Sequence, residues 1–96
     1  MDYEIRGRLE SYVDYLLTEK GLRNAHIMMS QFRPTVSSVK DAIFGFILGN
    51  TFSFYVDCID REYDRDINDD EVKTFYNIME LRAFSIKSKI SEIDNL

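Results

Sequence analysis

The sequence predicts an all-α fold, a small helical bundle whose last two helices form a long antiparallel hairpin. Three observations support this class. Apolar residues recur at helical spacing in four segments, capping residues precede two of these segments, and the one proline follows the second. With 96 residues the chain has the length of one domain, so we expect a single helical domain over residues 1–96.

The first two helices are expected over residues 3–20 and 23–32. The apolar side chains of the first follow i, i+3, i+4 spacing, at Ile5, Leu9, Tyr12, Val13, Leu16 and Leu17. Gly21 follows, and glycine is common just beyond a helix C-terminus. The apolar stripe of the second helix is Leu22, Ala25, Met29 and Phe32. Pro34 ends this helix, because proline disfavours the helical conformation of the residue before it.

The third helix is expected over residues 38–64. Ser38 with an acid three residues later resembles a capping box, which marks a helix start. The fifteen residues 42–56 then carry no charge. Helical spacing continues after the glycines of this stretch, at Leu48, Phe52, Tyr55, Val56, Ile59 and Tyr63.

A strand pair is the alternative for the same stretch. Gly49-Asn50 lies between two aromatic and β-branched runs, which is a hairpin signal. The alternative fold is therefore α+β, with a central β-hairpin at 42–58. Strict alternation of apolar and polar residues fails at Phe54, Tyr55 and Val56, and this failure favours the helix.

The fourth helix is expected over residues 69–94. Asn68 or Asp69 can cap it, and Asp70 and Glu71 lie in the first turn, where the helix dipole favours acids. One stripe then continues for more than twenty residues, through Val72, Phe75, Tyr76, Met79, Ala83, Ile86, Ile90 and Ile93.

Small residues recur every four positions along the expected third helix. Gly45, Gly49 and Ser53 form the centre of this row, while the other faces of the helix are apolar. Glycine costs about 1 kcal/mol against alanine inside a helix, so a compensating close approach is expected. The approach can come from a side chain of the same chain or from a partner. A helix that is apolar all round must be surrounded, and so short a chain cannot do this alone. We therefore expect a homodimer with an interface at Gly45, Gly49, Ser53, Phe46, Phe52 and Val56.

The acidic stretch DREYDRDINDDE, residues 60–71, resembles the calcium loop of the EF-hand family. In that register, positions 1, 3, 5, 7, 9 and 12 are occupied by Asp60, Glu62, Asp64, Asp66, Asn68 and Glu71. The resemblance implies calcium as a cofactor, with metal ligands at Asp60, Glu62, Asp64, Asp66 and Glu71. Two positions depart from the family pattern, because Arg65 replaces the turn glycine and Tyr63 is bulky. A plain solvated connector between helices has the same composition.

Charge narrows the classes of partner. Residues 41–71 carry nine acids and two bases, a net charge of −7, whereas the whole chain has −5. Phosphate backbones are repelled by such a surface, so no nucleic-acid partner is expected. Asp41 and Asp57 bracket only fifteen uncharged residues, fewer than the roughly 20 that span a bilayer, so a membrane partner is not expected. The single cysteine and the charged start, MDYEIRGRLE, favour a cytoplasmic protein.

The sequence contains no pattern typical of catalysis. His26 and Cys58 are the only histidine and cysteine, and they stand in separate segments. Glycine-rich phosphate loops and cysteine–histidine metal spacings are lacking. We therefore expect no enzyme and no resident cofactor. The expected function is a small interaction or assembly domain that binds itself or another protein, and a calcium-binding regulatory protein is the alternative.

Overall fold

A computed structural model describes residues 3–93. This part of the chain is all helical, with α1 at Tyr3–Leu16, α2 at Glu19–Ser30, α3 at Val39–Tyr63 and α4 at Asp69–Glu92. Helix accounts for 82% of the structure, and the described residues contain no strand. The all-α prediction is confirmed, and the alternative β-hairpin at 42–58 is wrong, because helical periodicity outweighed the local turn signal of Gly49-Asn50.

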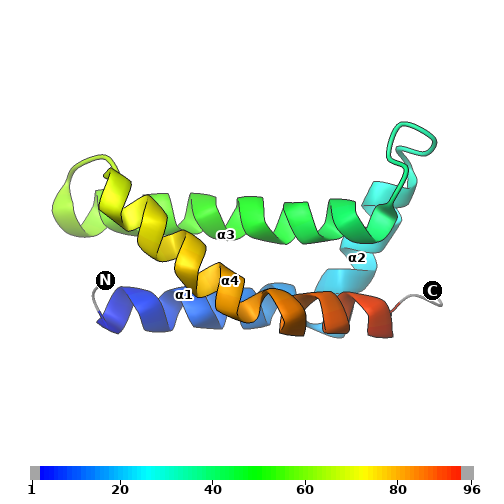
Figure 1. Ribbon diagram of the computed structural model, residues 1–96, viewed down its shortest axis with the longest axis horizontal. Helices are drawn as coiled ribbons and strands as arrows, with labels where there is room; N and C mark the ends of the chain where they lie inside the picture. The colour runs from blue at the N-terminus through cyan, green and yellow to red at the C-terminus, as the bar shows by residue number, and fades with distance from the viewer. Residues whose placement is uncertain (1–2, 94–96) are drawn as a thin grey trace.

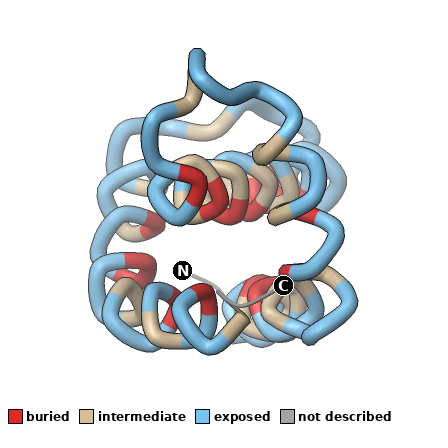
Figure 2. The backbone as a smooth tube through the Cα atoms, turned by 90° about the vertical axis from the view of Figure 1, so that its right-hand side faces the viewer, coloured by how far each residue is buried: buried red, intermediate tan, exposed pale blue. Residues whose placement is uncertain are grey.

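The helices form two layers (Figure 1). Helix α3 makes one layer, and α1 and the C-terminal half of α4 lie side by side beneath it (Figure 2). Helix α2 runs from the layer of α1 to the layer of α3 and lies beside the start of α3. Helix α4 runs back from the end of α3 but diverges from it toward the level of α1 (Figure 1). The close antiparallel hairpin expected from the sequence stays a prediction in that detail.

The boundary between the first two helices differs from the prediction. The first helix ends at Leu16 instead of 20, and Thr18 caps α2 with an extended backbone (φ −64°, ψ 156°). Gly21, expected beyond a C-terminus, lies in the first turn of α2 and donates its N–H to Thr18 Oγ1 at 3.1 Å. A Cβ added there would lie 2.8 Å from the Leu16 carbonyl oxygen, so the tight junction requires glycine.

The boundaries of α3 agree with the prediction within one residue. Ser38 is the N-cap, and its hydroxyl accepts a hydrogen bond from the Asp41 N–H at 3.2 Å. Asp64 ends the helix in the left-handed region, at φ 53°, and its N–H donates to the Asp60 carbonyl at 2.8 Å. Aspartate tolerates this conformation better than most residues other than glycine, which explains a C-terminus without glycine.

Helix α4 begins where the capping residues indicated. The Asn68 side chain accepts from the Glu71 N–H at 2.9 Å, and a Glu71 carboxylate oxygen accepts from the Asn68 N–H at 3.0 Å, which completes a capping box. The predicted end at 94 lies outside the described residues. The predicted stripe is wrong at two positions, because Val72 and Tyr76 are exposed while Ile78 is buried.

The core lies between the two layers. Each helix contributes one stripe, and the least exposed side chains are Ile5, Leu9, Val13, Leu22, Ile43, Ile47, Thr51, Tyr55, Ile59 and Ile86. Arg82 also joins α4 to α1, since its guanidinium donates to Glu10 at 3.3 Å and to Asp14 at 3.0 Å. The buried face of α3 is therefore covered by the other helices, and within residues 3–93 its opposite face has no neighbouring helix (Figure 2).

Candidate functional site

The side of α3 turned away from α1 and α4 is the first candidate site, and we call it the outer face. Its centre is the row of Gly45, Gly49 and Ser53, all exposed, which continues at both ends into exposed aspartates. The buried residues of the same helix, such as Ile43 and Ile47, lie on the opposite side. The structure thus places the three small residues of the predicted interface on one open helix face.

The two glycines are not required by packing inside the chain. A Cβ added at Gly45 or at Gly49 would meet no atom within 4 Å. The intrachain alternative, in which these glycines admit a neighbouring side chain, is therefore wrong for the structure of a single chain. Glycine is the least favourable residue for a helix interior apart from proline, so its presence twice in mid-helix has no explanation within one chain.

The other three predicted interface residues are half-buried and lie on the flanks of the outer face. Phe52 packs edge-on against Phe75 of α4, with ring centroids 5.1 Å apart. Phe46 borders an apolar hollow between the ends of α1 and α2, and Val56 stays partly accessible. Phe46 and Phe52 are thus packed against the core, while the row of small residues carries almost no side-chain volume. The expectation of large apolar side chains on every side of α3 is corrected, since its most exposed row is small or acidic.

The acidic turn is the second candidate site, and the structure does not bring its carboxylates together around a common point. Asp60 and Glu62 lie within the last turn of α3, and Glu62 accepts from Arg8 of α1 at 2.7 Å. Asp64 is the C-cap, and Asp66 lies in the connection to α4. Among residues 3–93, no three His, Cys, Asp or Glu side chains are close enough to hold a metal ion.

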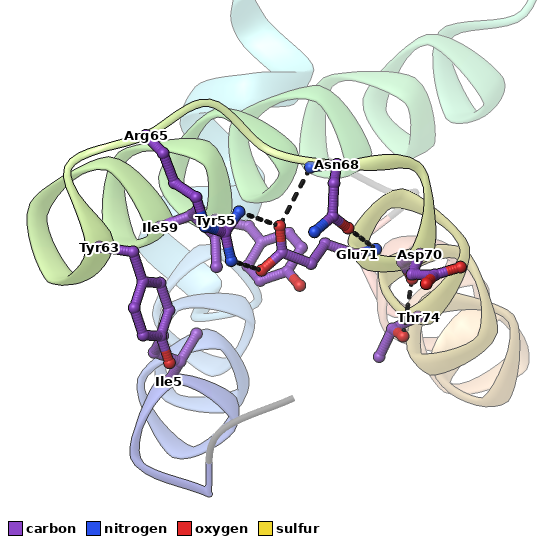
Figure 3. A pocket seen from close by; sticks show the side chains of 9 residues that line it. All are labelled: Ile5, Tyr55, Ile59, Tyr63, Arg65, Asn68, Asp70, Glu71 and Thr74. Atoms are coloured by element: carbon purple, nitrogen blue, oxygen red, sulfur yellow. Dashed lines mark hydrogen bonds and ion pairs between the residues drawn. The ribbon is translucent and has the colours of Figure 1, made fainter.

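Arg65 makes the contacts that organise the turn (Figure 3). Its guanidinium donates to the two carboxylate oxygens of Glu71 at 2.7 and 3.0 Å and to the carbonyl of Asp66 at 3.0 Å. It also lies 5.0 Å from the ring centroid of Tyr63. The residue that departs from the calcium-loop pattern is therefore a built-in cation that engages the carboxylate at position 12.

Glu71 is held ionised by these contacts. The hydrogen bond from Arg65, and then that from the backbone of Asn68, lower the pKa of the Glu71 carboxyl from its ordinary value. The Glu71 carboxylate thus forms a salt bridge with Arg65 and completes the capping box with Asn68. Nothing in this geometry favours a calcium site.

A pocket of about 260 Å³ lies beneath the Arg65–Glu71 pair (Figure 3). Tyr55 lines it, and its buried hydroxyl group has no hydrogen-bond partner among residues 3–93. Burial is the largest cause that raises the pKa of Tyr55, to about 12, so the phenol is neutral at physiological pH. The sequence indicated Tyr55 as a core residue but gave no signal that its hydroxyl is unsatisfied.

Cys58 and His26, the two residues considered for catalysis, have surroundings that do not activate them. Cys58 is 5% exposed, and burial is the largest cause that raises the pKa of its thiol. His26 is half-buried on α2, where Ser30 donates to its carbonyl oxygen at 2.7 Å. Neither residue lines the pocket beneath Arg65.

Large apolar side chains are also exposed on α4 and α2, and the sequence reasoning missed them. On α4, Leu81 is 80% exposed and Phe84 is 84% exposed. On α2 and just after it, Ile27 and Phe32 are each 55% exposed. The predicted stripe of the second helix is wrong at Phe32, because α2 ends at Ser30 and Phe32 lies beyond it. Leu81 and Phe84 lie three residues apart on α4, away from its buried stripe. Single exposed apolar residues are common on soluble proteins and do not define a site.

Charge is divided between the two ends of the molecule. Residues 20–40 contain four bases and no acid, a net charge of +4, and form the end with α2 and the segment after it (Figure 1). Residues 57–71 contain eight acids and two bases, a net charge of −6, and form the opposite end of the 41 Å long axis. The outer face of α3 lies between these two ends.

By length and composition, α3 could cross a membrane, and in the described part of the chain it is the one helix that passes this test. The core helix of a soluble bundle passes the same test. The buried side of α3 is covered by α1, α2 and α4, as in such a core helix.

The fold and the candidate sites define a small all-α bundle with one unpartnered helix face. Comparisons with protein-family models, with curated proteins and with solved structures find no match to this chain. The function is therefore argued from the geometry of the molecule alone.

Proposed function

We propose that this protein is a small, non-enzymatic interaction domain that forms a homodimer through the outer face of α3. The observation that carries the proposal is that Gly45, Gly49 and Ser53 form one exposed row on the uncovered face of α3, with open space where a Cβ of either glycine would stand. Two glycines that weaken a long helix by about 1 kcal/mol each are explained if a second helix approaches closely at that point. A second copy of the chain brings the same small surface and can supply that helix.

The flanks of the face support the same proposal. Phe52 and Phe54 are held by ring contacts to Phe75 and to Tyr12, the latter with centroids 4.4 Å apart. Their partly exposed edges border the glycine row and are positioned before any partner arrives. Side chains that are already ordered lose little conformational entropy on association, which favours binding.

The size of the face sets the strength of the dimer. A helix of 25 residues is about 37 Å long, and a single helix pair buries less surface than the standard interface of about 1,600 Å². The most exposed row also contributes little apolar area. We therefore expect a dissociation constant in the micromolar to millimolar range rather than an obligate dimer.

The double variant Gly45→Ala/Gly49→Ala tests this proposal. In a single chain the added methyl groups meet open space, so helix propensity should stabilise the monomer by about 1 kcal/mol per site. In the dimer the same methyl groups enter the closest contact, and the dissociation constant should rise about tenfold or more. Light scattering at several concentrations and urea unfolding at low concentration measure the two effects separately.

Gly7→Ala is the matched control. Gly7 lies inside α1, is exposed, and also has no atom within 4 Å of an added Cβ. This variant should gain helix stability in the same way and leave the dimer unchanged. A wild-type protein that stays monomeric at millimolar concentration would remove the proposal, as would a double alanine variant that dimerises as well as the wild type.

A further inference from the structure

We infer that the two copies pack antiparallel across the outer face of α3, so that the acidic end of each lies against the basic end of the other. This inference rests on the proposed function and specifies the orientation of the same interface. It follows from the charge along the molecule and from the shape at the start of α3.

The two possible orientations of the pair differ in the charges that they bring together. A parallel pair places the −6 segment, residues 57–71, beside its own copy, and like charges at close range oppose association. An antiparallel pair places it at the end of the partner that holds the +4 segment, residues 20–40. Within that segment Arg33 precedes the outer face of α3, whereas Arg23 pairs with Glu19 on α2. By the net charges of the two ends, the antiparallel arrangement is the attractive one.

The shape argument concerns residues 31–38, which join α2 to α3. This segment stands above α3 on the side away from α1 and α4, in both views of the molecule (Figures 1 and 2). In a parallel pair the two segments meet at one end and compete for the same space. In an antiparallel pair they lie at opposite ends, and each flanks the partner's acidic turn.

The spacing along α3 agrees with this arrangement. With the two-fold axis at Gly49, the start of α3 at Val39 lies about 15 Å to one side at 1.5 Å per residue. Asp60 lies about 16 Å from Gly49 in the opposite direction along α3, at the same rise per residue. The segment before α3, which contains the exposed Arg33, therefore lies at the same end of the interface as the partner's Asp60. The antiparallel contact brings the segment before α3 into register with the partner's acidic turn without moving any helix. It also sets the exposed Asp41 of each copy opposite the partner's Asp57, a like-charge contact that the attraction between the two ends must outweigh.

Spin labels at Asp41 and Asp57 measure the orientation. Both side chains are exposed and lie eight residues on either side of Gly49. Each is replaced by cysteine in a Cys58→Ala background, and pulsed electron paramagnetic resonance measures the distance between the two copies. The antiparallel dimer places the backbones of like positions about 24 Å apart in both samples, whereas a parallel dimer places them within about 10 Å. Light scattering on the same samples reports the mass.

The outcomes separate the inference from the proposal on which it rests. A dimer with the long distance at both positions supports the antiparallel pair. A dimer with short distances at both positions overturns the orientation and leaves the α3 interface standing. A dimer with both distances beyond about 40 Å, more than the length of α3, places the interface elsewhere and overturns both. A monomeric mass overturns both as well.

Charge exchange provides a second readout that does not depend on labels. Arg33→Glu and Asp60→Arg should each weaken the dimer about two- to fivefold, and both changes on one chain should restore it. Raised salt should weaken the wild-type dimer, because the attraction between the two ends is screened. Restoration is expected only where the two positions meet between copies. A double variant no tighter than the weaker single variant would contradict the antiparallel pair.

Discussion

Among single residues, Arg65 determines how the carboxylate of Glu71 in the acidic turn is used. Its guanidinium donates to both carboxylate oxygens of Glu71 and so supplies the positive charge that a bound cation would otherwise provide. The sequence showed Arg65 only as a departure from the calcium-loop pattern. Its partner is six residues away across a change of chain direction, and neither helical nor strand periodicity predicts such a contact.

The Arg65–Glu71 pair predicts how stability depends on pH. Because the pKa of Glu71 is lowered in the folded state, the pair contributes stability above the ordinary pKa of 4.5, and this contribution is lost as pH falls below it. Glu71→Gln keeps a side chain that can complete the capping box but removes the charge. Urea unfolding should show the variant less stable than the wild type at pH 7, with the difference shrinking toward pH 3.

Asp69→Asn is the control for this measurement, because Asp69 is exposed and lies in the same first turn of α4. Its loss should alter stability less at pH 7 than the loss of the Glu71 charge does. A Glu71→Gln variant as stable as the wild type at pH 7 would contradict the role given to the Arg65 pair.

Tyr55 provides a second prediction at this scale. Its hydroxyl is buried and has no partner, and an unsatisfied buried polar group costs about 1–3 kcal/mol. Tyr55→Phe should therefore stabilise the protein by about 1 kcal/mol in urea unfolding. Tyr76→Phe, at a side chain that is 62% exposed, should change little. A Tyr55→Phe variant that loses stability would show that the hydroxyl has a partner.

At the scale of helices, Asp64 gives a test of how α3 ends. It is the one non-glycine residue with positive φ among those described, and glycine adopts this conformation without steric cost. Asp64→Gly should stabilise the protein by about 0.5–1 kcal/mol. Asp60→Gly, one turn earlier and inside the helix, should destabilise it by about 1 kcal/mol. Thermal unfolding followed by circular dichroism measures both, and a loss of stability in Asp64→Gly would contradict the assigned C-cap.

The helix boundaries show how much of the fold the sequence could predict. The starts of α3 and α4 were predictable because Ser38 and Asn68 satisfy backbone N–H groups through short-range hydrogen bonds. The break between α1 and α2 was missed, because apolar periodicity continues to Leu17 and Gly21 resembles a C-terminal signal. Thr18 was the available signal, as threonine is a common N-cap.

The candidate site was predictable in part for a similar reason. The row of Gly45, Gly49 and Ser53 is a property of one helix, so spacing alone placed it on one face. Which face of a helix is covered depends on contacts between elements distant in sequence, and local patterns do not contain them. The exposed positions of Tyr76 and Phe84 on α4 depend on the same distant contacts, as α4 diverges from α3.

At the scale of the whole molecule, the central claim is that the outer face of α3 is covered by a second copy in solution. The chain covers the other side of α3 with three helices and leaves this face with two unexplained glycines between fixed aromatic flanks. Dilution of isotope-labelled protein followed by amide NMR tests the claim most directly. The four glycines give amide signals in a distinct region of the spectrum and include their own controls. A dimer through this face should give concentration-dependent shifts at Gly45 and Gly49 and none at Gly7 and Gly21, whereas invariant signals from all four glycines up to millimolar concentration would rule it out.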